Sequence, residues 1–198
     1  MKNKKNMNNP ILDVLYVILA SSAGYTFSQL DIKDRPFLGA VAILALIVVF
    51  IYFAGNFLDI LRCTIDVMCN QLLSRITVPL ICLDIVYPLQ EYQLLQNILM
   101  GGIGLMVVSI LLGSMGFNFD DNPISIAVTN VSLLGCCGFI FWISDSEAKY
   151  MKVAMAAMVS VYGPCVLELM ELYGWDIYLK LLSESVLVIL IGTQLVNK

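Results

Sequence analysis

The sequence predicts an all-α fold: a polytopic bundle of about six transmembrane helices in one membrane-embedded domain, residues 1–198. Residues 36–58, 92–119 and 122–144 contain no charged side chain over 23, 28 and 23 positions. Spanning the hydrocarbon core takes about 20 apolar residues in a helix. The composition agrees, because 60% of the residues are hydrophobic and 13% are charged, with a mean hydropathy of +0.87. Soluble domains carry roughly 25% charged residues.

Uncharged stretches and their polar flanks place the six predicted spans at residues 11–28, 36–58, 94–117, 123–143, 151–172 and 177–196. The first also fits a cleavable signal peptide, since three lysines precede its apolar core and Ser21, Ser22 and Ala23 follow it. Asp13 interrupts that apolar core. This interruption favours a first helix that is retained.

Residues 59–91, between the second and third spans, fit neither a span nor a solvated loop. Apolar side chains recur there at helical spacing opposite Arg62, Asp66 and Arg75, as in an amphipathic helix at the membrane surface. Residues 76–89 form an apolar run of only 14 positions with Asp84 inside it. We therefore expect an interfacial segment over 59–91, in which 76–89 is re-entrant or shallow rather than spanning.

Basic residues in the loops indicate the orientation, because they are retained on the cytoplasmic side. With a cytoplasmic amino terminus, six spans place eight basic residues inside and three outside, the three being Lys33, Arg35 and Lys180. We expect both termini in the cytoplasm. The membrane is expected to be the inner (plasma) membrane of a bacterium.

The chain contains no histidine, which is the usual general base near neutral pH and a common zinc ligand. Ser-His and Cys-His nucleophilic schemes are therefore excluded. The six cysteines show no CxxC spacing, so we interpret them as structural. A net charge of −4 without a basic patch argues against nucleic acid as a partner. We expect a protein that is not an enzyme and that holds no cofactor or metal ion.

Ionisable side chains inside the predicted spans are candidates for a functional site, because each costs about 2.5 to 3.5 kcal/mol to insert. The candidates are Asp13 in the first span, Glu168 and Glu171 in the fifth, and Lys180 and Glu184 in the sixth. Residues three or four apart share a helix face, so the last four can meet across two helices. The structural alternative is that Glu171 and Lys180 lie near helix ends and extend into the headgroups.

Small residues indicate close helix packing, on which association in lipid depends. They stand four apart at three places: Ala20 and Gly24, Ser109 and Gly113, and Ala156 and Ser160. Such faces serve packing within the bundle or contact with another subunit. We expect the lipid bilayer and other membrane-protein subunits as partners, in a homo- or hetero-oligomer. Pro164 is expected to kink the fifth span.

Three functions remain open. The first is a non-enzymatic component of a multi-protein membrane assembly, such as a secretion or transport apparatus. Residues 123–172 resemble the helix–basic loop–helix hairpin of type IV secretion pilins, with Lys149 and Lys152 in the turn. Four further hydrophobic segments depart from that two-helix pattern.

The second function is a small ion, proton or solute transporter or channel that uses acidic residues of the last two helices. The third is a membrane immunity protein against a pore-forming toxin, a class of comparable size.

Overall fold

The computed structural model describes residues 10–57, 62–114, 123–143, 148–170, 172 and 175–195. Within these ranges the side chains of residues 55–57, 62–72, 74, 90, 113–114, 123–126, 128 and 168–169 are not described. The described α-helices are α1 (Pro10–Gln29), α2 (Pro36–Phe57), α3 (Arg62–Val86), α4 (Gln93–Ser114), α5 (Pro123–Ile143), α6 (Ala148–Leu169) and α7 (Asp176–Leu190). A 3-10 turn, η1 (Gln90–Tyr92), precedes α4, and a π-helical turn, η3 (Ile191–Leu195), extends α7. The all-α prediction is confirmed for the described residues.

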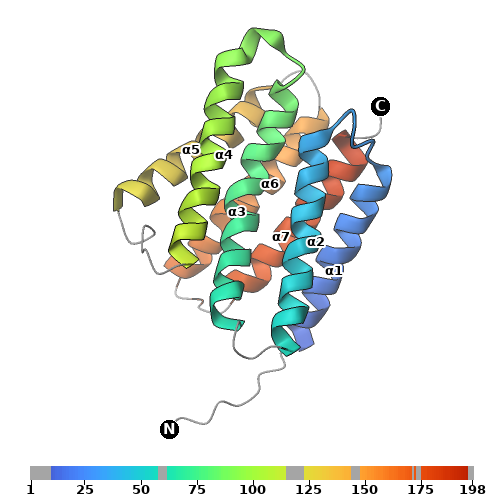
Figure 1. The fold of residues 1–198 in the computed structure, drawn as a ribbon, viewed down its shortest axis with the longest axis vertical. Helices are drawn as coiled ribbons and strands as arrows, with labels where there is room; N and C mark the ends of the chain where they lie inside the picture. Colours follow the sequence, from blue (N-terminus) through green and yellow to red (C-terminus); the bar gives the residue numbers. More distant parts are fainter. Residues whose placement is uncertain are drawn as a thin grey trace.

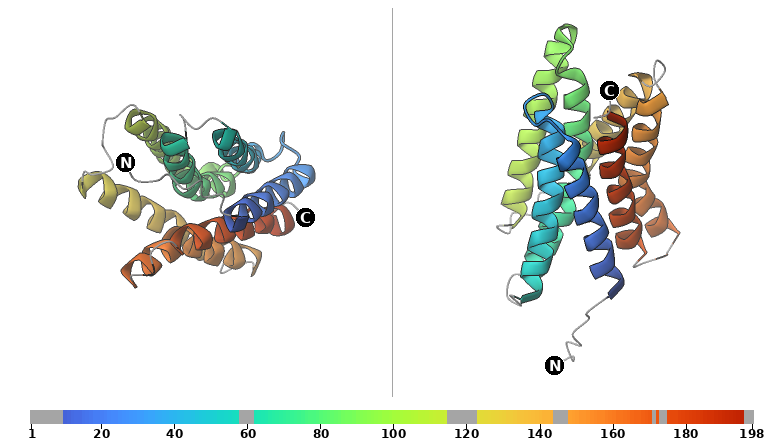
Figure 2. Two further views of the ribbon diagram at one scale, coloured as in Figure 1. Left: turned by 90° about the horizontal axis from the view of Figure 1, so that it is seen from below. Right: turned by 90° about the vertical axis from the view of Figure 1, so that its right-hand side faces the viewer.

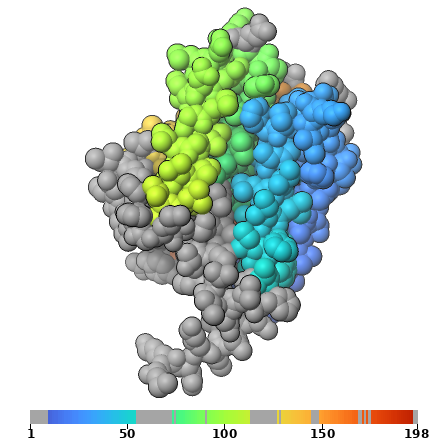
Figure 3. Space-filling model, viewed as in Figure 1, coloured from blue at the N-terminus to red at the C-terminus, as the bar shows by residue number. Residues whose placement is uncertain are grey.

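The helices alternate in direction (Figure 1), and the contacts between them close into a ring. α1 packs on α2, α2 on α3, α3 on α5, α5 on α6, α6 on α7, and α7 back on α1. α4 packs chiefly on α3, outside this ring. On the face drawn in Figure 3, α4 and α2 flank α3 and leave a strip of it visible. α3 packs on α2, α4 and α5 and also contacts α6 and α7.

The interfacial or re-entrant segment predicted for residues 59–91 is not confirmed by the described residues, 62–91. Residues 62–86 form one continuous helix, α3, in which every residue from Ile76 to Val86 is buried. The surface segment was predicted because residues 59–91 are less apolar than a helix that faces lipid. A helix enclosed by protein can carry charged side chains that face the bundle interior. The described residues therefore form seven helices where six spans and a surface segment were expected.

Four described helices contain segments long and apolar enough to cross a membrane: Pro10–Gln29, Pro36–Ala54, Gln93–Leu112 and Ala148–Leu167. Thr129–Ile143 is a shorter apolar segment. A helix of 20 residues is about 30 Å long, which matches the hydrocarbon core of a bilayer. Large apolar side chains face outward on these helices, among them Phe50, Leu94 and Leu105 at 73 to 76% exposure. Apolar outer surfaces of this kind are typical of contact with lipid or with a partner.

The N-terminal end of α1 and the C-terminal end of η3 lie at opposite ends of the bundle (Figure 2, right). α6 begins at the end of the bundle that carries the α1–α2 hairpin (Figure 1). Lys149 and Lys152, in the first turns of α6, therefore lie toward the same end as Lys33 and Arg35. The six-span prediction placed these two pairs on opposite sides of the membrane. With the pairs at one end, the distribution of basic residues no longer favours both termini in the cytoplasm.

Asp13 forms a structural contact between α1 and α2. Its carboxylate Oδ1 accepts a hydrogen bond from the Tyr52 hydroxyl at 2.9 Å. The Tyr52 ring stacks on Tyr16 with centroids 3.7 Å apart. Asp13 is thus paired, and its contact holds the first helical hairpin together.

Replacing Tyr52 by phenylalanine keeps the stacked ring and removes only the hydroxyl group. We expect the free energy of unfolding in detergent micelles to fall by about 0.6 kcal/mol, the mean measured for interhelical hydrogen bonds in a membrane protein. Tyr25→Phe, at an exposed position of α1, is the control and should change nothing measurable. An equal response in both variants would contradict the assigned hydrogen bond.

Candidate functional site

A cavity of about 200 Å³ lies between α3, α5, α6 and α7. Its described lining is rich in polar side chains, and consists of Arg75, Thr129, Asn130, Leu133, Ser160, Val161, Pro164, Cys165 and Lys180. Four helices far apart in the sequence therefore contribute to one site. We call it the α3–α7 cavity.

Two cationic side chains reach the α3–α7 cavity from different helices. Arg75 lies midway along α3 and is partly buried. Lys180 lies near the start of α7, is also partly buried, and forms no ion pair with another described residue. No acidic side chain is found among the described residues that line the cavity. The described part of the lining therefore contributes two basic side chains from two different helices.

Glu184 lies one helical turn beyond Lys180 on α7 and is fully buried. Neither carboxylate oxygen has a hydrogen-bond partner among the residues that the structure describes. The neighbouring serines do not supply one, because Ser183 donates to the Lys180 carbonyl and Ser185 to the Leu181 carbonyl, at 2.9 and 2.7 Å. A buried polar group without a partner is costly and needs an explanation. Glu184 is the strongest such case in the described part of the chain.

Two prolines loosen the backbone beside the α3–α7 cavity. Pro79 lies inside α3 and Pro164 inside α6. A proline removes the helical hydrogen bond to the carbonyl four residues earlier, here those of Arg75 and Ser160. Both residues line the cavity. On α6, Gly163 also permits close approach of α7, since a Cβ there would lie 2.9 Å from Leu179 Cδ2.

A hydrogen bond joins α5 and α6 beside the cavity. The Tyr162 hydroxyl donates to the Asn130 backbone carbonyl at 3.1 Å. Cys165 faces the cavity and is exposed. The thiol is therefore accessible to a reagent that enters the cavity.

The five predicted site residues are found in different surroundings. Lys180 and Glu184 belong to the α3–α7 cavity and its adjoining turn. Asp13 is paired with Tyr52 on the far hairpin. Glu171 lies outside the described residues, and Glu168 belongs to α6 without a described side chain. The two-glutamate face that they were predicted to form on α6 therefore remains a prediction.

Arg75 was not among the predicted site residues. The sequence places it in the segment interpreted as a surface helix, where a basic side chain is expected to face water. Its role follows only from the enclosure of α3 by other helices. The sequence signal for this position is Arg75 followed four residues later by Pro79.

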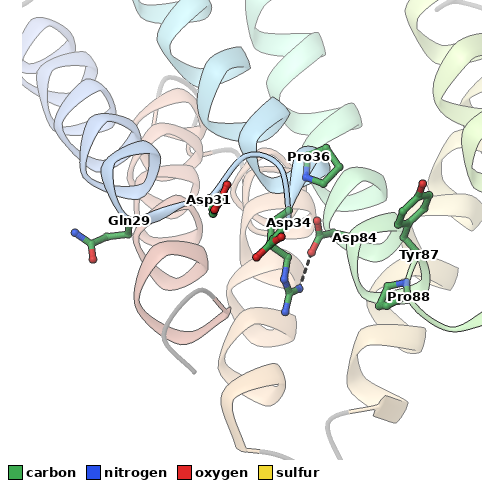
Figure 4. A pocket seen from close by; sticks show the side chains of 8 residues that line it. Gln29, Asp31, Asp34, Pro36, Asp84, Tyr87 and Pro88 are labelled. Atoms are coloured by element: carbon green, nitrogen blue, oxygen red, sulfur yellow. Dashed lines mark hydrogen bonds and ion pairs between the residues drawn. The ribbon is translucent and has the colours of Figure 1, made fainter.

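A second, larger pocket of about 580 Å³ lies at the end of the bundle that carries the α1–α2 hairpin. The Arg35 Nη1 atom donates to Asp84 Oδ2 at 2.8 Å within it, the dashed contact in Figure 4. Asp31 and Asp34 of the hairpin also line the pocket. The ion pair joins the α1–α2 hairpin to α3, so we assign it a structural role. It also explains the position of Asp84 inside an apolar run.

The remaining described cysteines lie in apolar surroundings. Cys82, Cys136 and Cys137 are buried and unoxidised, and the first two border an apolar pocket of about 310 Å³ between α3, α4 and α5. Among the described residues, no group of three or more histidine, cysteine or acidic side chains is arranged to hold a metal ion.

Fold and cavity together define the class of the chain. Its described residues form an all-α bundle in which four helices are long and apolar enough to cross a membrane, with a cavity among them whose described lining is largely polar. Comparisons with family models, with curated proteins and with solved structures find no match. The functional argument therefore depends on the chemistry of the site.

Proposed function

We propose that this chain is an integral membrane protein that moves a small ion or solute through the α3–α7 cavity. The observation that carries the proposal is the buried, unpartnered carboxylate of Glu184 one turn from Lys180 and the cavity. A purely structural bundle has no need for such a group. The proposal favours transport over the assembly function, which the sequence placed first.

The energetic cost of the polar groups supports transport. Each ionisable residue within a membrane costs about 2.5 to 3.5 kcal/mol on insertion scales. Arg75, Lys180 and Glu184 incur this cost near one cavity, and Glu184 recovers none of it through a hydrogen bond. Ionisable residues of this kind mark substrate and ion pathways in membrane proteins.

Local backbone geometry supplies a means of opening the site. Pro164 interrupts the hydrogen bonds of α6 next to Gly163, where α7 approaches closely. Helices broken or bent near the bilayer midplane form the binding sites of many transporters. Bending of α6 at this point would widen or narrow the cavity, because Ser160, Pro164 and Cys165 of its lining lie on both sides of the bend.

We further propose that all seven helices cross the inner (plasma) membrane with the amino terminus in the cytoplasm. The helices alternate in direction, so an odd number of crossings places the two ends on opposite sides. This proposal replaces the expectation of two cytoplasmic termini, which needs an even number of crossings. α3 is the least apolar of the described helices, and its neighbours in the bundle shield it from lipid.

Replacing Glu184 by glutamine tests the transport function. Protein reconstituted in liposomes is assayed for flux of protons, monovalent cations and small anions, and we expect the rate to fall about tenfold or more, the effect of roughly 1.4 kcal/mol on a barrier. Glu91→Gln, at an exposed position of η1, is the matched control and should transport normally. Flux that is the same in both variants, or absent for every solute in the unmodified protein, would contradict the proposal.

The assembly function is the second candidate, favoured by the open faces of α4 and α5. α4 packs chiefly on α3, and a Cβ added at Gly101, Gly102 or Gly104 would meet nothing within 4 Å. Gly135 and Gly138 on α5 are equally open. Glycines permit close approach of another helix in lipid. Recovery of a cross-linked partner that is lost on Gly104→Leu, but not on Gly24→Leu of α1, would support this candidate.

A further inference from the structure

We propose that Cys82 and Cys136 form a covalent modification site, at which hydrogen peroxide converts the two thiols into a disulfide bond between α3 and α5. The site is separate from the transport function, because its chemistry needs no flux through the protein. For these two residues it adds a redox role to the structural one that the spacing of the six cysteines suggested.

The two thiols come from different helices and meet where those helices pack together. Cys82 lies on α3 and Cys136 on α5, which are in contact. The two side chains share a hydrogen bond, in which the Cys82 thiol is the donor and the Cys136 sulfur the acceptor. A disulfide forms without large movement of the backbone only between cysteines whose side chains point toward each other. The hydrogen bond shows that these two side chains do.

An apolar pocket of about 310 Å³ gives a small oxidant access to the pair. Cys82 and Cys136 both border this pocket, which lies between α3, α4 and α5. Gly102 and Gly135 also line it, and a Cβ added at either would meet nothing within 4 Å. Hydrogen peroxide is small and uncharged, so it can enter such a space. A charged oxidant would first have to lose its hydration at a large cost in free energy.

Hydrogen peroxide is the only co-reactant that the modification needs. The Cys136 sulfur accepts a hydrogen bond, which favours its thiolate, the nucleophilic form of cysteine. This sulfur attacks one peroxide oxygen, the O–O bond breaks, and the products are a sulfenic acid on Cys136 and one water molecule, which takes up the thiol proton.

The second step forms the bond between the helices. The Cys82 sulfur attacks the sulfenic sulfur of Cys136, and the hydroxyl group leaves with the Cys82 proton as a second water molecule. Two thiols and one peroxide thus give one disulfide and two waters. The two sulfurs lose two electrons in total, and the peroxide oxygens gain them.

The disulfide would join two walls of the α3–α7 cavity. Arg75 and Leu133 line that cavity on α3 and α5. Cys82 follows Arg75 by about two helical turns, and Cys136 follows Leu133 by about one. A covalent bond at this distance restricts the separation of α3 and α5 beside the cavity.

The experiment oxidises the folded, full-length protein in lipid nanodiscs with hydrogen peroxide. Remaining thiols are blocked with N-ethylmaleimide in denaturant, and the digested protein is analysed by mass spectrometry. We expect a pair of peptides linked through Cys82 and Cys136, which dithiothreitol separates. In Cys82→Ala this pair should be absent, and dimedone should trap the sulfenic acid on Cys136 instead.

Cys137 provides the matched control. It is adjacent to Cys136 and equally enclosed, at 1% exposure, but it is not part of the described lining of the pocket. Cys137→Ala should therefore form the Cys82–Cys136 link to the same extent as the unmodified protein. Circular dichroism and gel filtration confirm that each variant is folded.

A second pair of variants tests the route of the oxidant and leaves every cysteine in place. Gly102→Leu fills part of the pocket, so we expect the link to form several-fold more slowly. Gly104→Leu, on the same helix but outside the described lining of the pocket, should leave the rate unchanged. Equal rates in these two variants would contradict the pocket as the route.

Three outcomes would overturn the modification site itself. One is the absence of the Cys82–Cys136 link after the exposed Cys165 has been oxidised in the same sample. Another is a link between Cys136 and Cys137 in its place. The third is a link that forms only after the protein has been unfolded in sodium dodecyl sulfate. None of these outcomes depends on flux, so a failure of the site and a failure of the transport function are separate results.

Discussion

Replacing Arg35 by leucine is expected to lower the free energy of unfolding by about 3 kcal/mol. The reason is that Asp84, whose side chain is only 2% exposed, loses the guanidinium that lies 2.8 Å away. Removing one member of a buried pair costs about 3 to 5 kcal/mol, because the other charge stays buried without compensation. Arg35 is 30% exposed, so we expect the lower end of this range. The measurement is equilibrium unfolding in mixed detergent micelles.

Two further variants isolate the ion pair as the cause. Lys33→Leu removes an exposed basic side chain from the same hairpin and should change stability by less than about 0.5 kcal/mol. Arg35→Leu/Asp84→Leu removes both charges and should recover more than half of the loss, since apolar replacement of a whole buried pair is often neutral. A single Arg35→Leu variant as stable as Lys33→Leu would show that the pair does not hold the hairpin to α3.

Replacing Gly192 by alanine is the second prediction of large effect, and it tests the packing of α7 against α1. A Cβ at Gly192 would lie 2.7 Å from Thr26 Oγ1 and 3.0 Å from Thr26 Cα. The Cα belongs to the backbone of α1, so the two helices must separate. We expect the free energy of unfolding to fall by about 1 to 3 kcal/mol, as in other overpacked cores.

The contact that this separation disturbs is a buried hydrogen bond. The Thr26 hydroxyl donates to the Val188 carbonyl at 2.6 Å, at the point where α7 passes into the π-helical turn η3. Gly24→Ala on α1 is the control, since a Cβ there meets nothing within 4 Å. Alanine gains up to about 1 kcal/mol over glycine inside a helix. The two substitutions should therefore change the free energy of unfolding in opposite directions, and changes of the same sign and size would contradict the close packing.

Most helices were predictable from hydropathy because they have enough apolar residues to face lipid. The span predicted at residues 123–143 coincides with α5, and that at 36–58 exceeds α2 by one residue. α3 was missed for a physical reason: it is enclosed by other helices and can therefore carry Arg75 and Asp84. Hydropathy detects helices that are apolar enough to contact lipid, and it does not detect a helix that is shielded by protein.

The candidate site was predictable in part for a related reason. Lys180 and Glu184 are ionisable residues in a short apolar helix. The free-energy cost of inserting them into a membrane was enough to predict them as site candidates. Their proximity to Arg75 depends on the packing of α7 against α6 and α3. A local sequence pattern does not predict such packing. Asp13 and Glu184 are both acidic residues inside predicted spans. Tyr52 donates a hydrogen bond to Asp13, whereas Glu184 accepts none from the described residues. Burial cost therefore indicates candidates, and only the contacts separate structural groups from functional ones.

The most direct test of the seven-helix account is the position of the two ends of the chain relative to the membrane. Reporters that are active on only one side are fused before Met1 and after Lys198, in separate proteins expressed in the same cells. Seven crossings predict a cytoplasmic reporter at the amino terminus and an external one at the carboxyl terminus. Two reporters on the same side would contradict seven crossings and with them the enclosure of the α3–α7 cavity within the bilayer.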